Sequence, residues 1–181
     1  MGLDMNRVRN PEMKEFVIGL VKAGTPVNAV AATGTLTLTG VVADGQTVTI
    51  GSRVYEFDTN SSVTSGNVAV DVSGGVTASA AVTALVAAIT ADASAVVTAV
   101  DGAGDTVVCT AKVKGTAANS YATTETCTNG SWGGATLTGG VNSTKGRDNE
   151  LMADSSYLYV SVDKSTLTTT NWRRISLGSA Y

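Results

Sequence analysis

Histidine is absent from the 181 residues of the chain. Its absence removes histidine general bases, Ser-His-Asp triads and histidine-ligated metal sites from the possible functions. Charged residues are also scarce, at 15% compared with roughly 25% in an average soluble domain. The net charge is −3 and no basic stripe is present, so we expect no nucleic-acid partner. These absences favour a protein that is not an enzyme and that carries no cofactor and no metal.

Other segments with a defined physical signature are missing too. The longest uncharged apolar stretch, Val72–Ala91, is interrupted by Ser, Gly and Thr and does not have the pattern of a membrane span. The opening sequence MGLDMNRVRNPEMKEF contains acids and no apolar run, so we expect no secretory signal. The two cysteines, Cys109 and Cys127, fit neither a disulfide framework nor a zinc site. Both fall in predicted strands, as reduced and half-buried thiols or, alternatively, as a cross-strand disulfide.

What the chain has in abundance is β-branched side chains and glycine. It contains 27 Thr, 25 Val and 20 Gly, a composition typical of short strands joined by tight turns. Nine of the twelve basic residues lie in residues 1–22 and 145–181, whereas the sequence between them is sparsely charged and mildly acidic. We therefore divide the chain into an N-terminal arm (1–32), a β-rich core module (33–141) and a linker with a C-terminal hairpin (142–181).

A short helix is predicted in the N-terminal arm. Asn10 is the N-cap, Pro11 suits the first helical position, and Gly24 ends the helix. Its apolar side chains recur at i, i+3, i+4 and i+7 and form one stripe of Met13, Phe16, Val17 and Leu20. Three turns are not stable alone, so this stripe either covers the chain's own sheet or docks on a neighbouring subunit.

Four strands are predicted at the start of the core module. They are TGTLTLTG (33–40), QTVTI (46–50), RVYEF (53–57) and NVAVDV (67–72), and the turns Asp44-Gly45 and Gly51-Ser52 indicate an antiparallel meander. Glu56 and Asp58 leave one face of the third strand, opposite its aromatic residues. Paired carboxylates can act in acid–base catalysis. The simpler interpretation is the solvated side of an amphipathic strand.

The remainder of the core module switches period and then returns to strands. Residues 77–91 repeat Val82, Leu85, Val86 and Ile89 at helical spacing, which predicts one amphipathic helix packed on the sheet. Strands follow in ASAVVTAV, DTVVCTAKV and YATTETCTN, and DGAGD (101–105) is predicted to be a turn and not a calcium loop. The predicted fold class is α+β, mainly β: an antiparallel sheet with one packed helix, a short N-terminal helix and a C-terminal β-hairpin.

Candidate interface residues lie near the C-terminus. The hairpin YLYVSV…NWRRISL combines the aromatic and arginine side chains that are enriched at interface hot spots: Tyr157, Tyr159, Trp172, Arg173 and Arg174. Trp132, between glycines in NGSWGG, is a candidate for stacking on a sugar or base. We favour a turn residue that folds back on the core or contacts a neighbouring subunit.

The core module resembles a small module of tailed-bacteriophage virion proteins. The resemblance covers residues 33–141 and consists of an ADG-x-TV-x-IG hairpin, an aromatic strand, an Ala-rich helix and a GSWGGATLTGG ending. The C-terminal YLYVSV…NWRRISL is similar to end segments of phage head-fibre and tail-fibre proteins. Cys109 and Cys127 depart from the usual pattern, because Val, Thr or Leu is expected at those strand positions.

The resemblance implies a structural component of the virion, made in the cytoplasm of a bacterial host. The leading hypothesis is a capsid decoration or cement protein that binds the major capsid protein and assembles as a homo-oligomer, with a trimer as the first guess. One alternative is a tail, baseplate or fibre protein. Another is a carbohydrate-binding module displayed on the particle, with Trp132 and the tyrosines as its platform.

Overall fold

The chain divides into two compact units. The computed structural model describes residues 21–23, 27–143, 151–161 and 172–177. One unit, which we call the body, comprises residues 30–142. The other, which we call the terminal unit, comprises residues 1–29 together with 143–181. Segments from both ends of the chain therefore belong to the same unit.

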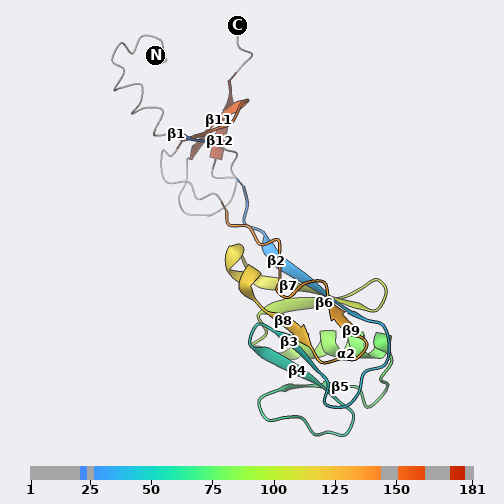
Figure 1. Cartoon of the computed structure of the whole chain (residues 1–181). Helices are drawn as coiled ribbons and strands as arrows, with labels where there is room; N and C mark the ends of the chain where they lie inside the picture. Colours follow the sequence, from blue (N-terminus) through green and yellow to red (C-terminus); the bar gives the residue numbers. More distant parts are fainter. Residues whose placement is uncertain (1–20, 24–26, 144–150, 162–171, 178–181) are drawn as a thin grey trace, which may run out of the picture. The chain divides into compact units, whose positions relative to one another are not determined.

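The body contains two four-stranded sheets and a helix (Figure 1). The first sheet has the order β6-β7-β2-β9, and its pairs are all antiparallel. The second has the order β5-β4-β3-β8. The bounds are β2 Ala31–Leu38, β3 Thr47–Ile50, β4 Arg53–Asp58, β5 Val68–Asp71, β6 Val97–Gly102, β7 Thr106–Lys114, β8 Thr123–Glu125 and β9 Gly130–Trp132.

Helix α2 spans Ala78–Ala91, as the 3.6-residue period predicted. Thr77 caps its first turn, because the Thr77 hydroxyl oxygen accepts a hydrogen bond from the Ala80 N–H at 3.3 Å. The helix, the green coil in Figure 1, packs mainly on β6 and β5. Its inner stripe is fully buried and consists of Ala81, Val82, Leu85 and Ile89. A short 3₁₀ helix, η2, follows β7 at Thr116–Ser120.

The core of the body forms between the inner faces of these elements. Strand alternation placed the correct side chains inside: those of Leu36, Leu38, Val48, Ile50, Tyr55 and Phe57 are at most 1% exposed. Of the valines that alternate along the predicted strand 67–72, Val70 and Val72 are buried and Val68 is half-buried. The fold is α+β and mainly β, with one amphipathic helix packed in the body, which confirms the predicted class.

The predicted meander is wrong in its pairing. The Asp44-Gly45 turn exists, and Gly45 has a positive φ of 74°, but β2 and β3 belong to different sheets. The turn is instead bound to β4, because Gly45 N–H donates to Phe57 O and Phe57 N–H donates to Gln46 O. The second turn does connect an antiparallel hairpin, β3–β4, whereas β5 runs parallel to β4.

The terminal unit contains a sheet of order β1-β10-β11-β12. Its strands are Val21–Ala23, Leu151–Ala153, Tyr157–Ser161 and Trp172–Ser176. The antiparallel β11–β12 pair confirms the predicted hairpin, and β10 was not predicted. Most of the predicted N-terminal helix, including Met13, Phe16, Val17 and Leu20, lies outside the described residues. Its last turn was wrong, because Val21–Ala23 is a strand that pairs in parallel with β10.

Both cysteines are free and buried in the body. Cys109 lies in β7 as predicted, but Cys127 follows the end of β8 in a turn, so its assignment to a strand was wrong. Strand β8 ends here because the Thr47 N–H, which would donate to the Thr126 carbonyl in a continued ladder, instead donates to the Thr126 side-chain hydroxyl at 2.8 Å. The two thiols form no disulfide, so the alternative prediction of a cross-strand disulfide was wrong.

Candidate functional site

The terminal sheet presents two chemically different faces. Register pairs Tyr159 with Arg174 and Met152 with Tyr159, so these side chains share a face. Strand alternation adds Tyr157 and Trp172 to the same side, which we call the aromatic face. The opposite side, which we call the aliphatic face, carries Leu151, Ala153, Leu158, Val160, Arg173 and Ile175.

The aromatic face brings together four of the residues that the sequence singled out. The guanidinium carbon of Arg174 lies 4.7 Å from the centre of the Tyr157 ring, a cation–π arrangement. The rings of Tyr157 and Tyr159 are tilted by 55° with centroids 6.1 Å apart. Tyr159, Trp172 and Met152 form a small buried cluster. Asp154 holds the β10–β11 turn, because its carboxylate accepts the N–H of Tyr157 at 2.8 Å and the Tyr159 hydroxyl at 2.7 Å.

Trp172 is buried, and its indole N–H has no hydrogen-bond acceptor among the described residues. Its side chain is 7% exposed, and its indole Nε1 is the buried side-chain nitrogen or oxygen that lacks a hydrogen-bond partner in the described part of the chain. A buried donor without an acceptor costs roughly 1–3 kcal/mol.

The aliphatic face is open to solvent along β12, whereas its β10 and β11 side chains are half-buried. Ile175 is 57% exposed and Leu177, which continues the same side beyond β12, is 51% exposed. Arg173 is also exposed, and it lies across the strands from Val160. Sequence reasoning missed Ile175 and Leu177 as candidate interface residues. The signal was available, because alternation along the hairpin places them on the side opposite the aromatic residues.

Trp132, the remaining predicted site residue, belongs to the body. It lies in β9 opposite Leu36, half-buried against the core. A Cβ built on Gly34 would lie 2.6 Å from Leu137 Cδ2 and in ordinary contact with the Trp132 ring at 3.6 Å, so the glycine makes room for Leu137 beside the indole. The indole N–H donates to the Thr124 carbonyl at 3.2 Å. Trp132 therefore packs within the body, and its indole N–H reaches from β9 to β8 of the other body sheet.

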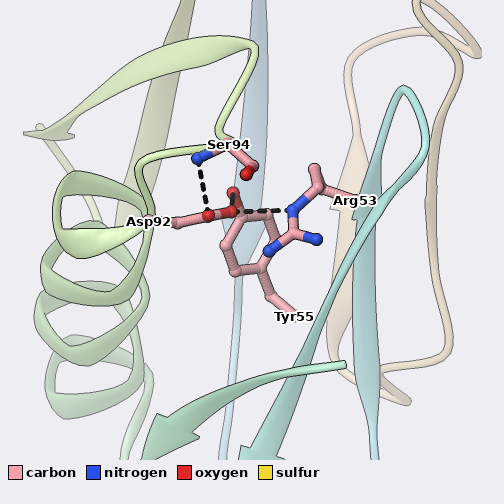
Figure 2. A network of polar contacts seen from close by, with 4 residues as sticks. All are labelled: Arg53, Tyr55, Asp92 and Ser94. Carbon is pink, nitrogen blue, oxygen red and sulfur yellow. Dashed lines mark hydrogen bonds and ion pairs between the residues drawn. The ribbon is translucent and has the colours of Figure 1, made fainter. Parts of the chain in front are cut away.

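A polar cluster of the body joins the end of α2 to β4. Asp92 Oδ2 accepts hydrogen bonds from Arg53 Nε at 2.8 Å and from the Tyr55 hydroxyl at 3.1 Å. Its other oxygen, Oδ1, accepts the Ser94 N–H at 2.9 Å (Figure 2). The Arg53 hydrogen bond lowers the pKa of Asp92 below its ordinary 3.8, and burial raises the pKa of Tyr55. Every member is engaged, so this cluster fastens the helix to the sheet and holds no free acid or base.

Acid should weaken this junction. A carboxyl whose pKa is lowered in the folded state stabilises that state above its unfolded pKa, and the contribution is lost as the pH falls through the folded value. We expect the free energy of unfolding of the body to decline below about pH 4. Asp92→Asn should flatten this decline. Denaturant titrations between about pH 7 and about pH 3 measure both slopes.

The exposed carboxylate of Asp101 provides the matched control for that comparison. Asp101→Asn removes one negative charge from the body without affecting Arg53 or Tyr55. It should leave the decline of the free energy of unfolding at low pH unchanged. Equal slopes for the Asp92 variant and the unmodified chain would contradict a stabilising role for the junction.

Glu56 and Asp58 were expected to be solvated, and this expectation was wrong. They are 5% and 9% exposed because the segment 59–67 folds over them. Glu56 accepts the Thr64 N–H at 3.1 Å and the Asn67 amide at 2.5 Å, which lower its pKa. Asp58 Oδ1 accepts two backbone N–H groups, those of residues 60 and 62. The two carboxylates therefore organise the loop 59–67 through hydrogen bonds to it.

Other possible sites in the body carry little chemistry. Burial raises the pKa of Cys109 to about 12 and that of Cys127 to about 11, so neither thiol is a nucleophile at neutral pH. The described residues contain no group of three or more Cys, Asp or Glu able to hold a metal ion. A depression of about 520 Å³ beside the start of α2 is lined by small residues and by Asp71, whose carboxylate accepts from Ser73. Across the ranges that the structure describes, no helix has the length and apolarity to span a bilayer.

Comparisons with known proteins add no assignment to this geometry. A scan against protein-family models, a search of curated proteins and a search of solved structures each returned no match.

Proposed function

We propose that the chain is a non-catalytic structural component of a phage particle, a decoration or cement protein that binds the major capsid protein of the head. In this proposal the terminal unit is the part that grips the shell. The body is the folded domain that the terminal unit attaches to the surface of the head.

The observation that carries the proposal is the aliphatic face of the terminal sheet. A sheet is stable in water when its apolar faces are covered, yet Ile175 and Leu177 are 57% and 51% exposed. Arg173 stands beside them, and Arg and apolar side chains are what interface cores favour over Lys, Glu and Asp. A shell protein that covers this face would bury the apolar side chains and meet the guanidinium with a carboxylate or carbonyl.

The chemistry of the body supports a structural role. Its best-formed polar cluster, Arg53 with Tyr55 and Asp92, is closed on itself. The carboxylates of Glu56 and Asp58 accept hydrogen bonds from the loop that follows β4. The cysteines of the body are buried and of raised pKa. These groups are engaged within the body, where they stabilise its fold.

Binding to empty heads tests the proposal. The unmodified chain should sediment with shells assembled from the major capsid protein of the same phage, and labelled chain should decorate the head in negative-stain images. Ile175→Glu should weaken binding by about 30-fold or more, because a buried charge would replace a buried apolar contact. Its fold should be intact, since the side chain is exposed in the free chain.

Val41→Glu is the matched control. Val41 is also 57% exposed, but it belongs to the body, so the same chemical change should leave head binding unaltered. Equal binding by the Ile175 variant and the unmodified chain would overturn the assignment of the aliphatic face. Label found only on tails, or absent from particles, would overturn the role as a head protein.

A further inference from the structure

The outer face of the first body sheet is a regular grid of small uncharged side chains. Register places Val100, Val108, Thr35 and Gly133 in one row across β6, β7, β2 and β9. The row on one side of it contains Thr98, Thr110, Thr33 and Thr138, and the row on the other contains Gly102, Thr106, Thr37 and Ser131. These positions alternate with the core-facing ones, so they all point away from the core.

This grid lacks the charges that normally solvate an open sheet face. Within residues 30–142, all of which are described, three bases oppose eight acids, yet none of the twelve grid positions is charged. Its central row carries two valines, a threonine and a glycine, and the outer valine, Val100, is 58% exposed. Depletion of charge around an apolar centre is the compositional mark of an interface core. Threonine hydroxyls suit such a surface, because each can donate or accept a hydrogen bond.

The charges at the two ends of the grid are opposite in sign. Lys112 and Lys114 are exposed at the end of β7. Asp105, also exposed, lies in the turn before the start of β7. Val108 is near the midpoint between Asp105 and Lys112 along the chain. A rotation of 180° about an axis through Val108 and across the strands therefore exchanges the basic end for the acidic end.

We propose that this grid is the contact between two copies of the chain, packed face to face about that two-fold axis. The arrangement lays β7 of each copy antiparallel over β7 of the other, so the Lys112 end of each copy overlies the Asp105 turn of the other. An axis along the strands would instead bring the two Lys112 side chains together. The uncharged centre avoids the like-charge repulsion that an isologous contact between acidic bodies would otherwise create.

The size of the grid sets the strength of the contact. Four strands spaced about 4.8 Å apart, over about six residues of about 3.3 Å each, give a face roughly 20 Å on a side. Two such faces remove on the order of 1,000 Å² of accessible surface, which is near the lower limit for a specific interface. The dimer is therefore weak in dilute solution. This inference rests on the body alone and goes beyond the proposed binding to the head.

The test is the mass of the full-length chain in solution as a function of concentration. Sedimentation equilibrium should show a reversible shift from the 18.2 kDa chain to twice that mass. Val100→Lys places like charges near the axis and should raise the dissociation constant by about 100-fold or more. Val41→Lys, at nearly the same exposure but outside the grid, should change it by less than about threefold. Unfolding curves of both variants should match that of the unmodified chain.

A second variant tests the orientation. Lys112→Glu puts a carboxylate at the end that overlies the partner's Asp105 turn and should weaken the dimer by about tenfold. A chain that remains monomeric at every concentration, or that forms a trimer, overturns the proposal. So does a Val100 variant that dimerises as tightly as the unmodified chain. Failure of head binding leaves this measurement unaffected, so the two proposals fail separately.

Discussion

Replacing Phe57 by alanine is expected to lower the free energy of unfolding of the body by about 3–5 kcal/mol. The Phe57 side chain is 0% exposed and belongs to the main core cluster. Its backbone also ties β4 to the preceding loop, because Phe57 N–H donates to Gln46 O and Phe57 O accepts from Gly45 N–H. Alanine keeps these backbone hydrogen bonds and leaves a cavity. The decrease in the free energy of unfolding therefore measures the lost side-chain packing.

The two cysteines allow this loss to be measured in the full-length chain. Cys109 and Cys127 are 0% and 6% exposed and both lie in the body, so a thiol reagent labels them only when the body opens. The Phe57 variant should label faster by about two to four orders of magnitude in the regime where reclosing outpaces labelling. Val41→Ala, which trims an exposed side chain, should label at the rate of the unmodified chain. Equal rates for Phe57→Ala would mean that this part of the core is not integral to the body.

Gly140→Ala is expected to destabilise the body by about 3 kcal/mol. A Cβ at this position would collide with the Gly115 carbonyl oxygen and would lie 2.8 Å from Asn119 Oδ1. The same Asn119 amide already binds the backbone of Gly140 twice, through Gly140 N–H at 2.8 Å and Gly140 O at 3.0 Å. The new methyl group must therefore push apart β7, η2 and the end of the body or break these bonds.

Gly134→Ala is the control for this substitution. Its nearest neighbour is the Thr136 carbonyl oxygen at 3.6 Å, an ordinary van der Waals contact, and its φ lies outside the left-handed region. The midpoint of thermal unfolding should fall by several degrees in the Gly140 variant and by little in the Gly134 variant. Similar midpoints for the two would show that the contact around Gly140 relaxes without cost.

Local periodicity was sufficient to predict which side chains form the core. Alternation placed Leu36 and Val48 inside, and the helical period found the buried stripe of α2, because burial follows directly from side-chain direction. Pairing between strands was not predictable in the same way. The Asp44-Gly45 turn reverses the chain whichever partners the strands find, and β2 pairs with β7 and β9 through contacts distant in sequence.

The buried acids show a second limit of sequence reasoning. Alternation correctly put Glu56 on the face opposite the aromatic residues, but burial also depends on what covers that face. The covering segment, 59–67, has the polar composition of an ordinary loop, and its role emerges only from the bonds of Thr64 and Asn67 to the Glu56 carboxylate.

The candidate interface was chosen by residue type, and its role stays a prediction. Residue type identified the hairpin and its aromatic face, where Tyr157 and Arg174 do meet. The exposed aliphatic face was overlooked, because a leucine or isoleucine in a strand is usually a core residue and exposure is decided by tertiary packing. The stripe of Met13, Phe16, Val17 and Leu20 lies outside the described residues, so its partner stays a prediction.

The course of the chain makes the body an insertion within the terminal unit. Residues 1–29 and 143–181 together form one unit, and the 113 residues of 30–142 leave and rejoin it at neighbouring points. At those points Val30 N–H donates to Val141 O at 2.9 Å and Val141 N–H donates to Val30 O at 3.1 Å. Domains whose two ends lie side by side are readily transplanted. The body can therefore be exchanged for another small domain. Any domain with adjacent termini can be inserted in the chain between β1 and β10, and the terminal sheet would then present that domain.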